Sequence, residues 1–282
     1  MTILLTGHKG FIGSNLVKKL EKHKIIGVDL KDGNNILDSN FVNNLFFKNH
    51  FDAVIHLAAI AGVGYSIEHS EEVLTDNIIG FDILAKAAIK HNVKHFIYAS
   101  SSSVYGDDGT QKSPYAVSKT TNELQAAMYS NLSDVKFTRL RFFTVYGQGI
   151  RQDLAISKFI KAMKTNTPLY VYGDGNQKRD FTYIGDITEA IKLILESDKC
   201  WKNEVFDIGY GKSTTVNELI DILKGFINPT FDKVVYQDEK PYDVKATLAN
   251  TNKLYEWFGF RPMYNIKEGL SIFIKNNNSY GK

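Results

Sequence analysis

A tyrosine and a lysine four residues apart are the clearest candidates for proton chemistry in this sequence. They stand in the run Tyr115-Ala116-Val117-Ser118-Lys119, and on a helix this spacing puts both side chains on one face, one turn apart. A phenol with its ordinary pKa of about 10 is a poor base at neutral pH. A neighbouring ammonium favours the phenolate and lowers that pKa. The pair therefore predicts a tyrosine base that takes the proton of a substrate hydroxyl; the alternative is a half-buried tyrosine beside a solvated lysine without a chemical role.

Four consecutive serines supply hydroxyl groups upstream of this pair. Ser100, Ser101, Ser102 and Ser103 directly follow an apolar run at 96–99 that is typical of a buried strand. A hydroxyl at the end of such a strand can hydrogen-bond a reacting hydroxyl and orient it toward a base. A serine-rich turn without a chemical role is the alternative interpretation, and the tyrosine–lysine pair favours the chemical one.

A glycine-rich segment near the N-terminus indicates a dinucleotide site. Gly7, Gly10 and Gly13 have the spacing GxxGxxG directly after the first apolar run, and Phe11 and Ile12 begin a stretch with helical spacing. Glycines permit a tight turn and let the backbone approach a pyrophosphate closely. The N-terminus of the following helix presents free amides and a positive dipole end to the phosphates.

An acidic residue indicates which dinucleotide this segment binds. Asp29 ends the second apolar run, where a carboxylate can accept hydrogen bonds from the adenosine ribose hydroxyls. Its negative charge repels a 2′-phosphate and so favours NAD over NADP; Lys31 is the nearest base. A tight turn plus a surface aspartate is the alternative. The order strand, loop, helix, strand and acid favours an NAD site.

Strand and helix signals alternate along the first half of the chain. Strands are expected at 3–6, 25–29, 53–57, 96–99 and 136–141, and helices at 11–20 and 75–90. Strands that are apolar on both faces and separated by helices are typical of a parallel sheet covered by helices. We therefore expect an α/β fold with a Rossmann-type doubly wound parallel sheet, which binds its ligand at the carboxyl ends of the strands.

The pattern changes after about residue 145. Strands are expected at 168–172, 204–208 and 234–236, and helices at 154–163, 188–195 and 215–226. We expect two domains, an NAD-binding Rossmann domain over 1–145 and a smaller C-terminal α/β substrate lobe over 146–282 that is partly interleaved with the first.

Composition narrows the class of protein. Apolar residues make up 43% of the 282 residues, and the net charge is only +3, which favours a globular protein and disfavours partners such as nucleic acid. No run approaches the roughly 18 apolar residues that span a bilayer, and no signal segment is visible. Cys200 is the single cysteine and the seven histidines are scattered. We predict a cytoplasmic protein without a metal or a membrane partner.

These motifs, in this order, resemble the extended short-chain dehydrogenase/reductase family, and within it the nucleotide-sugar epimerases and dehydratases. The resemblance covers nearly the whole chain. Its motifs are the glycine loop with Asp29, Val54-Ile55-His56-Leu57-Ala58-Ala59, Asn77, the serine run ending Val104-Tyr105-Gly106, Tyr115 with Lys119, Arg141-Phe142-Phe143-Thr144-Val145-Tyr146-Gly147, and Lys178-Arg179-Asp180-Phe181-Thr182-Tyr183-Ile184.

The resemblance implies a role for each matching residue. Ser101 takes the place of the family's catalytic serine or threonine, Tyr115 is the base and Lys119 its partner. Arg179 would bind the substrate's pyrophosphate, and Asp243 lies in a stretch that resembles the nucleotide-contacting segment. The remaining residues implied to line the cofactor are Asn35, Ile36, Leu57, Ala58, Ala59 and Asn77. Helices at 75–90 and 115–130 resemble the pair that forms a homodimer.

Two positions after Ser101 favour epimerisation over dehydration. Dehydratases of this family carry Asp-Glu there, whereas this chain has Ser102 and Ser103, so the acid and base for loss of water are missing. Epimerisation needs only removal of a hydride, rotation of the sugar and return of the hydride. Tyr115 would take the C4 hydroxyl proton while C4 gives its hydride to NAD, and the resulting 4-keto sugar would turn over before reduction.

A later segment indicates the sugar. The residues from Thr144 to Ala155 resemble the RFFTVYG…GRPDMA stretch of UDP-glucuronate 4-epimerases, with Thr144 and Arg151 matching the residues that hold the sugar carboxylate. Oxidation at C4 makes a β-keto acid, which loses carbon dioxide when its carboxylate stands perpendicular to the keto plane. A hydroxyl and a guanidinium can hold the carboxylate away from that geometry. Gly64 stands where glucuronate epimerases often carry arginine.

The sequence therefore predicts an NAD-dependent 4-epimerase of UDP-glucuronate and leaves three alternatives open. The first is a 4-epimerase of UDP-glucose/galactose or of UDP-N-acetylhexosamines, for which Arg151 would matter little. The second is a UDP-glucuronate decarboxylase, which would release carbon dioxide. The third is a non-catalytic NAD-binding sensor or scaffold, which Ser101, Tyr115 and Lys119 disfavour.

Overall fold

The computed structural model describes residues 1–278. Contacts within the chain divide it into two compact units. The first comprises Met1–Phe142 and Thr188–Asp207, and the second comprises Phe143–Ile187 and the residues from Ile208 onward. Each unit is therefore built from two stretches of sequence, and the chain passes from one unit to the other three times.

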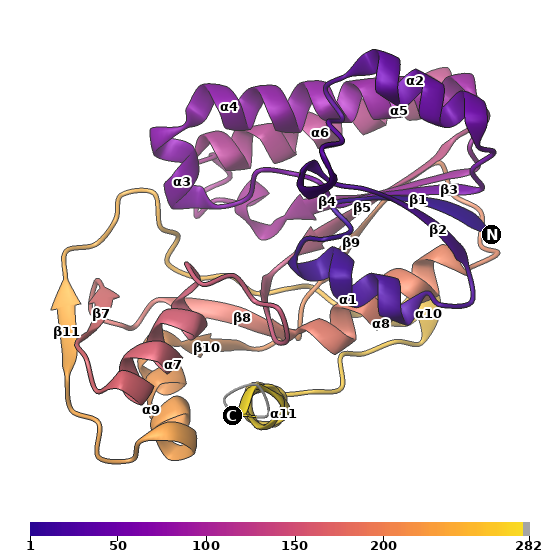
Figure 1. The fold of residues 1–282 in the computed structure, drawn as a ribbon. Helices are drawn as coiled ribbons and strands as arrows, with labels where there is room; N and C mark the ends of the chain where they lie inside the picture. The colour runs from indigo at the N-terminus through magenta and orange to yellow at the C-terminus, as the bar shows by residue number, and fades with distance from the viewer. Residues whose placement is uncertain (279–282) are drawn as a thin grey trace. The chain divides into compact units, whose positions relative to one another are not determined.

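A six-stranded sheet forms the centre of the first unit (Figure 1). Its order is β2-β1-β3-β4-β5-β9, and the pairs from β2 to β5 are parallel. The strands are β1 Thr2–Thr6, β2 Lys24–Val28, β3 Ala53–His56, β4 His95–Ser101, β5 Lys136–Phe142 and β9 Asn203–Ile208. The order reverses at β1 and β3, as in a doubly wound sheet. The predicted Rossmann-type α/β fold is confirmed.

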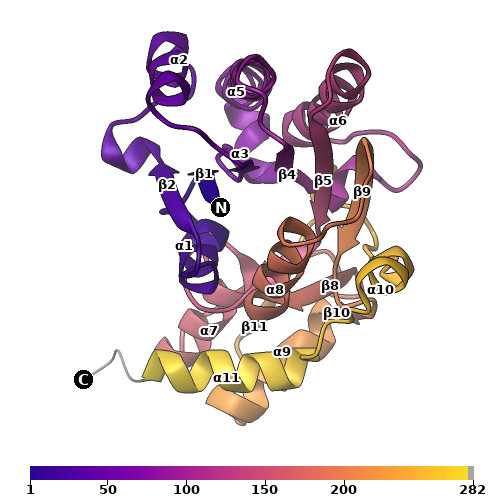
Figure 2. The same ribbon diagram turned by 90° about the vertical axis from the view of Figure 1, so that its right-hand side faces the viewer.

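Helices cover both faces of this sheet. Figure 2 shows α2, α5 and α6 side by side on one face, with α1 on the other. The helical segments are α1 Phe11–Lys19, η1 Leu30–Asp32, α2 Ser39–Lys48, α3 Val63–Glu68, α4 Ser70–Leu74, η2 Thr75–Ile79, α5 Gly80–Lys90, η3 Ser102–Val104 and α6 Pro114–Leu132. Fully buried aromatic rings fill the space under α5, where Phe81 lies 5.5 Å from Phe96 and 5.0 Å from Tyr98 between ring centroids.

The helix expected at 75–90 is not one continuous α-helix. Its first turn, η2, is a π-helix, and the α-helix begins at Gly80. Two side-chain amides of α6 donate hydrogen bonds to backbone carbonyls of this wide turn. Asn122 Nδ2 donates to the Asn77 carbonyl at 2.9 Å, and Gln125 Nε2 donates to the Ile78 carbonyl at 3.2 Å. Insertion of partners into the helical ladder is a known cause of such turns. The spacing of apolar residues at 75–90 does not predict hydrogen bonds from Asn122 and Gln125, so it does not predict the π-helical turn.

The second unit contains two small sheets. One has the order β10-β8-β6 and the other pairs β11 with β7. Their strands are β6 Thr144–Tyr146, β7 Leu169–Tyr172, β8 Lys178–Tyr183, β10 Ser213–Thr215 and β11 Val234–Gln237, and the helices are α7 Ala155–Thr165, α9 Val216–Ile227, α10 Asn252–Phe258 and α11 Ile266–Asn278. A further helix, α8 Ile184–Leu195, begins in this unit and ends in the first. Leu219, Leu223 and Leu270 are fully buried in the core of the second unit.

Helix α6 has an unusual distribution of polar and apolar residues. Its buried residues include Ser118, Lys119, Asn122, Glu123 and Ser130, whereas its exposed residues include Val117, Leu124, Met128 and Leu132. Directed polar contacts, rather than apolar packing alone, therefore hold this helix to the first unit. Over residues 1–278, no helix combines the length and apolar character that crossing a membrane requires.

Candidate active site

The glycine loop makes a close backbone cradle at the end of β1. Gly7 has a φ of +72°, and a Cβ built on it would lie 2.7 Å from the backbone nitrogen of Ala58. A Cβ on Gly13 would lie 2.1 Å from the Gly7 carbonyl oxygen. The loop therefore has no room for side chains at these two positions. Gly10 is the N-cap of α1 and offers no capping side chain, so the first-turn amides, including those of Phe11 and Ile12, suit a bound pyrophosphate.

Asp29 ties this loop to the segment after β2. Its carboxylate accepts hydrogen bonds from the backbone N–H of Lys9 and of Lys31, each at 3.0 Å. Two further contacts cross the same space: Lys9 pairs with Asp32, and Lys31 Nζ donates to the Lys9 carbonyl at 3.1 Å. Each carboxylate oxygen keeps a lone pair for a ribose hydroxyl. The acid predicted to select NAD therefore also holds the phosphate loop in shape.

A cavity of about 220 Å³ lies against the glycine loop. The predicted cofactor residues that line it are Gly7, Gly10, Asp29, Asn35, Ile36, Leu57, Ala58 and Ala59. It is also lined by residues that sequence reasoning missed, namely Val28, Leu30, Lys31, Asn34, Ile60 and Asp76. The missed residues are neighbours in sequence of predicted ones, so extending each motif by one or two positions would have found most of them. The cavity and the cradle fit a dinucleotide cofactor.

Asn77 supports the cavity wall with its side chain. It is 1% exposed, and its amide makes three hydrogen bonds: Oδ1 accepts from Ile60 N–H at 2.9 Å, and Nδ2 donates to the Ile60 carbonyl at 3.1 Å and to Ser118 Oγ at 3.0 Å. All hydrogens of that amide are used. Asn77 thus fixes the segment after β3 to α6, and its neighbours Ile60 and Asp76 line the cavity instead.

Tyr115 and Lys119 lie together on α6, as their spacing predicts. The helix begins with Ser113 as N-cap, whose side chain accepts from Ala116 N–H, and with Pro114 in the first turn. Lys119 Nζ lies 5.9 Å from the centroid of the Tyr115 ring and donates to the Ala99 carbonyl at 2.9 Å. Tyr115 is partly exposed, whereas Lys119 is 2% exposed.

Burial sets the ionisation of Lys119. It lowers the pKa of this lysine to about 8, because the low-dielectric surroundings disfavour the charged form. Burial, together with the charge of Lys119, lowers the pKa of the buried His56 to about 3, so this imidazole is neutral. Its Nδ1 lies 2.8 Å from Thr6 Oγ1, and the same hydroxyl accepts from Ala58 N–H at 3.3 Å. With His56 neutral, the ammonium of Lys119, 5.9 Å from the centroid of the Tyr115 ring, is a cation that can stabilise a tyrosinate.

The serine run ends β4 and forms a tight turn. Ser101 is the N-cap of η3: its Oγ accepts from Ser103 N–H at 3.2 Å and lies 2.6 Å from Ser103 Oγ. Ser101, Ser102 and Ser103 are all partly exposed, and η3 packs against α6. The structure thus brings the element that carries the predicted catalytic serine against the helix that carries Tyr115.

The predicted substrate residues of the second unit form two separate ion pairs. Arg151 binds Asp153 through Nε and Nη2, with a distance of 2.9 Å between Nε and Oδ1. Arg179 Nη2 lies 3.7 Å from Asp243 Oδ1. These two residues, both predicted to bind the substrate, therefore lie next to each other. Thr144 begins β6 and pairs in register with Phe181 of β8.

Asp180 explains how Arg179 and Asp243 come together. It is fully buried, and its carboxylate accepts from the backbone N–H of Tyr210 and Gly211, each at 2.8 Å, and of Ala249 at 3.1 Å. Burial raises the pKa of this carboxyl, although these hydrogen bonds oppose the shift. The bonds hold the residues before Ala249 alongside β8, next to Arg179. Asp243 is about half exposed; its partial burial raises the pKa of its carboxyl, and the charge of Arg179 opposes this shift.

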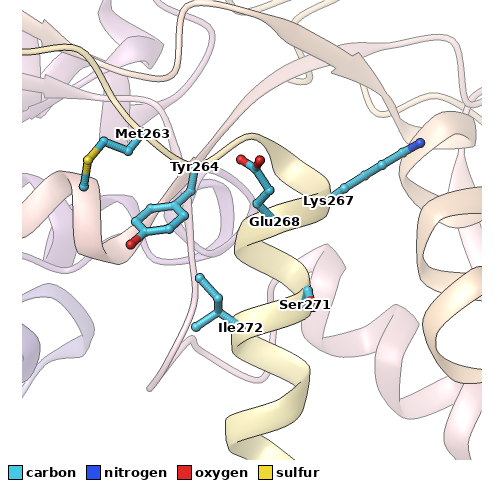
Figure 3. Close-up of a pocket in the computed structure, with 6 residues that line it drawn as sticks. All are labelled: Met263, Tyr264, Lys267, Glu268, Ser271 and Ile272. Carbon is cyan, nitrogen blue, oxygen red and sulfur yellow. The ribbon is translucent and has the colours of Figure 1, made fainter.

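A second hollow, of about 560 Å³, lies at the start of α11. Figure 3 shows the residues that line it, Met263, Tyr264, Lys267, Glu268, Ser271 and Ile272. None of the predicted site residues is among them. Within the described residues, no group of three histidine, cysteine, aspartate or glutamate side chains could hold a metal ion. The prediction that the protein uses no metal stays a prediction.

Similarity to known proteins identifies the class to which this fold and site belong. Residues 3–209 match the NAD dependent epimerase/dehydratase family, and the chain belongs to that family. The predictions of the family, of an NAD cofactor and of an epimerase of nucleotide-sugars are confirmed at this level.

Individual relatives narrow the comparison further. The chain is 34% identical to a UDP-glucuronate 4-epimerase of Thermodesulfobacterium geofontis, over 91% of this chain and 80% of that protein. A UDP-glucose 4-epimerase of Thermotoga maritima, solved with UDP-glucose, has a TM-score of 0.93 at 29% identity and full coverage of both chains. A UDP-glucuronic acid 4-epimerase of Bacillus cereus, solved with UDP-glucuronic acid and NAD, has a TM-score of 0.92 at 29% identity, covering 99% of this chain and 100% of that one.

Gly13→Ala should weaken the retention of NAD. The new methyl group would overlap the Gly7 carbonyl, and such overpacking costs about 1–3 kcal/mol. If the loop recovers its shape only when NAD binds, this cost corresponds to a loss of affinity of about 5- to 150-fold. The measurement is the NAD content of the purified protein and the Kd of added NAD. Gly225→Ala, where a Cβ meets nothing within 4 Å, serves as control. Retention of NAD at the wild-type level by Gly13→Ala would contradict the assignment of the loop.

The pKa of Lys119 predicts how turnover depends on pH. An ordinary lysine stays charged to about pH 10.4, but burial lowers the pKa of Lys119 to about 8, so its ammonium is lost as the pH rises through 8. Since the neutral amine no longer favours the tyrosinate, kcat should fall on this alkaline side. Lys119→Arg, which stays charged, should show no such fall. The test is the kcat of both proteins from pH 6 to 10; a wild-type rate that stays constant to pH 10 would refute it.

Proposed function

We propose that the protein converts UDP-glucuronate to UDP-galacturonate by NAD-dependent 4-epimerisation through a 4-keto intermediate. The observation that carries the reaction type is the buried Lys119 ammonium beside the ring of Tyr115, at the end of the strand that leads into the serine turn. Membership of the epimerase/dehydratase family and the similarity to UDP-sugar 4-epimerases support it.

The residues of the first unit then have distinct tasks. The amides at the start of α1 hold the pyrophosphate of the cofactor, and Asp29 binds its ribose. Ser101 orients the C4 hydroxyl of the sugar, and Tyr115 takes the proton of that hydroxyl and later returns it. Lys119 stabilises the tyrosinate that exists before the proton is taken and again after it is returned. A bound NAD would supply the hydride acceptor for oxidation at C4 and the hydride donor for the reduction that follows.

Arg151 is the residue that would select a uronate, by binding its carboxylate. Its guanidinium already binds one carboxylate, that of Asp153, through two nitrogens, which is the geometry that a sugar carboxylate would need. The sugar carboxylate would displace or share this position, with Thr144 as a second donor. Held in this way, the carboxylate of the 4-keto intermediate stays out of the orientation that favours loss of carbon dioxide.

The same ion pair also favours a second candidate. If Asp153 keeps Arg151 neutralised during turnover, the site carries no free cation for a uronate. A neutral hexose is then preferred, and the protein is a 4-epimerase of UDP-glucose/galactose or of UDP-N-acetylhexosamines. The similarity to the UDP-glucose 4-epimerase supports this alternative. Arg179, paired with Asp243, would bind the diphosphate in either case.

Substrate choice can be tested directly by proton NMR with UDP-glucuronate, UDP-glucose and UDP-N-acetylglucosamine. We expect conversion of UDP-glucuronate, and we expect Arg151→Ala to lower its kcat/KM by about 10- to 100-fold, because a charged hydrogen-bonded contact is worth about 1.5–3 kcal/mol. Arg261→Ala, which removes an arginine that stacks on Tyr255, is the matched control.

Each other outcome of this experiment selects a different function. Turnover of a neutral sugar that Arg151→Ala leaves unchanged identifies the neutral-sugar epimerase. Carbon dioxide and a UDP-pentose among the products identify a decarboxylase. NAD binding without turnover of any of the three sugars favours the sensor or scaffold. The cytoplasmic location stays a prediction.

We further propose that the protein forms a homodimer through α6. The exposed apolar residues Val117, Leu124, Met128 and Leu132 recur at intervals of seven, four and four, so they share one face of the helix. Leu124 is 67% and Leu132 72% exposed. A contiguous apolar face of this kind marks an interaction surface, and a second copy of the same chain is self-complementary to it about a two-fold axis.

Leu124→Glu should convert this dimer to a monomer. A charge at the centre of the apolar face would be buried without a partner on association. Sedimentation equilibrium at micromolar protein concentration gives the mass of each species. Phe47→Glu, which changes an exposed apolar residue of α2 (82% exposed), should leave the dimer intact. A monomeric wild-type protein would refute the proposal.

A further inference from the structure

A buried carboxylate lies behind the tyrosine–lysine pair on the same face of α6. Glu123 is four residues after Lys119 and eight after Tyr115, so the three side chains follow one another along the helix. It is 7% exposed. No part of the proposed reaction uses Glu123, and its spacing from Lys119 is the sequence signal that could have drawn attention to it.

Both oxygens of Glu123 are bound by groups from the sheet. Oε1 accepts from Ser100 Oγ at 2.6 Å and from Arg141 Nε at 2.9 Å. Oε2 accepts from Arg141 Nη2 at 2.6 Å and from Arg139 Nη1 at 3.3 Å. Glu123 therefore joins α6 to β4 and β5 through four contacts, two of which form a bidentate pair with Arg141.

The partners of Glu123 lie beside the serine turn. Ser100 pairs in register with Arg141 across β4 and β5, and Ser101 is the next residue of β4. Arg141 also donates from Nη1 to Tyr105 Oη at 2.8 Å, and its guanidinium lies 4.6 Å from the centroid of the Tyr105 ring. Tyr105 Oη in turn donates to Asp207 at 2.7 Å. The cluster thus connects the helix of Tyr115 with both ends of the serine turn.

Stability alone does not account for such a cluster. Removal of a carboxylate from water is costly, and a well-packed apolar pair of the same volume often stabilises a protein as much or more. Burial acts to raise the pKa of Glu123, but hydrogen bonds from Arg141 and Ser100 and the charges of Arg141 and Arg139 outweigh it and lower the pKa below its usual value. Glu123 is therefore an ionised carboxylate at neutral pH.

We propose that Glu123 is a positioning residue that fixes the rotation and axial placement of α6 against β4 and β5, and thereby the places of Tyr115 and Lys119 relative to the serine turn. This inference rests on the proposed function, in which Tyr115 is the base. The buried face of α6 is mostly polar, so apolar packing leaves its placement weakly defined. A four-contact charged cluster permits only one placement.

The geometry of a helix makes this placement matter. A shift of α6 by one residue would rotate Tyr115 by about 100° and move it by about 1.5 Å along the axis. Misplacement of a reacting group by about 1 Å can lower a rate about 100-fold. Lys119 makes only one hydrogen bond to β4, at Ala99, whereas Glu123 anchors the next turn of the same helix at Ser100.

The first test compares turnover in two variants of the NAD-loaded protein. Glu123→Gln keeps the shape of the side chain and removes its charge. Glu123→Met with Arg141→Met replaces the charged pair by apolar groups and keeps the protein folded if the single variant is unstable. We expect kcat to fall about 10- to 100-fold in both, with KM for the sugar nucleotide and NAD content within about threefold of the wild type. Glu196→Gln, which removes a carboxylate paired with His23, is the control.

The second test measures the ionisation of Tyr115 by ultraviolet difference titration of NAD-loaded protein against Tyr115→Phe. If Glu123 holds Lys119 in place, its loss moves the ammonium away and shifts the ionisation of Tyr115 to higher pH. Simple removal of a negative charge would shift it to lower pH, and a merely structural role would leave it unchanged in the folded fraction. This measurement needs no substrate, so it stays informative if the wild-type protein converts none of the three sugars and the proposed function fails.

The proposal requires an ionisation of Tyr115 that moves to higher pH and, when the wild-type protein converts a sugar nucleotide, a lowered kcat at unchanged KM; when it converts none, the titration alone decides. A kcat per folded, NAD-loaded molecule within threefold of the wild type overturns it. So does an ionisation of Tyr115 that stays in place or moves to lower pH, whatever happens to kcat.

Discussion

The proposed chemistry depends on one interaction, the approach of the buried ammonium of Lys119 to the ring of Tyr115. A lysine removed from water loses much of its preference for the charged form, and the structure compensates with one carbonyl, that of Ala99, and with the ring of Tyr115 nearby. The same burial that lowers the pKa of Lys119 also excludes the water that would screen its charge. An ammonium in such a place acts strongly on a neighbouring phenol. The surrounding elements, from the polar face of α6 to the turn after β4, serve to keep these two groups together.

A second constraint acts in the glycine loop after β1, where main-chain atoms lie very close to one another. Gly7 and Gly13 lie so close to their neighbours that no Cβ fits, and Asp29 holds the loop from the opposite side through Lys9 N–H. Close approach of main-chain atoms requires glycine at fixed positions, and the Lys9 N–H requires an acceptor such as the carboxylate of Asp29. Both requirements fix residue types, so the sequence alone predicts this loop. The second unit differs, because its Arg151 and Arg179 pair with carboxylates of the same unit, Asp153 and Asp243. The net charge at these two places therefore depends on side-chain pairing.

Local patterns were sufficient for most of the first unit. Apolar runs predicted β1 to β5 to within about two residues, because strands covered on both faces must be apolar throughout. The pairing of Tyr115 with Lys119 followed from the helical period. The π-helical turn at Thr75–Ile79 did not, since it depends on Asn122 and Gln125, which are distant in sequence. Strands β6, β8 and β10 were also missed, because β6 and β10 have only three residues each and β8 begins with three charged residues, Lys178, Arg179 and Asp180.

The sequence by itself determined the parallel sheet, the dinucleotide loop with its acid and the helix that carries a tyrosine next to a lysine, because each of these is a local pattern of residue types. Only the tertiary structure decided which groups neutralise one another. Glu123 accepts hydrogen bonds from Arg141 and Ser100, and Arg151 binds Asp153. The side-chain amide of Asn77 is likewise hydrogen-bonded to Ile60 and Ser118. Charge pairing and burial depend on which segments fold side by side, and the order of residues along the chain does not specify that without the fold.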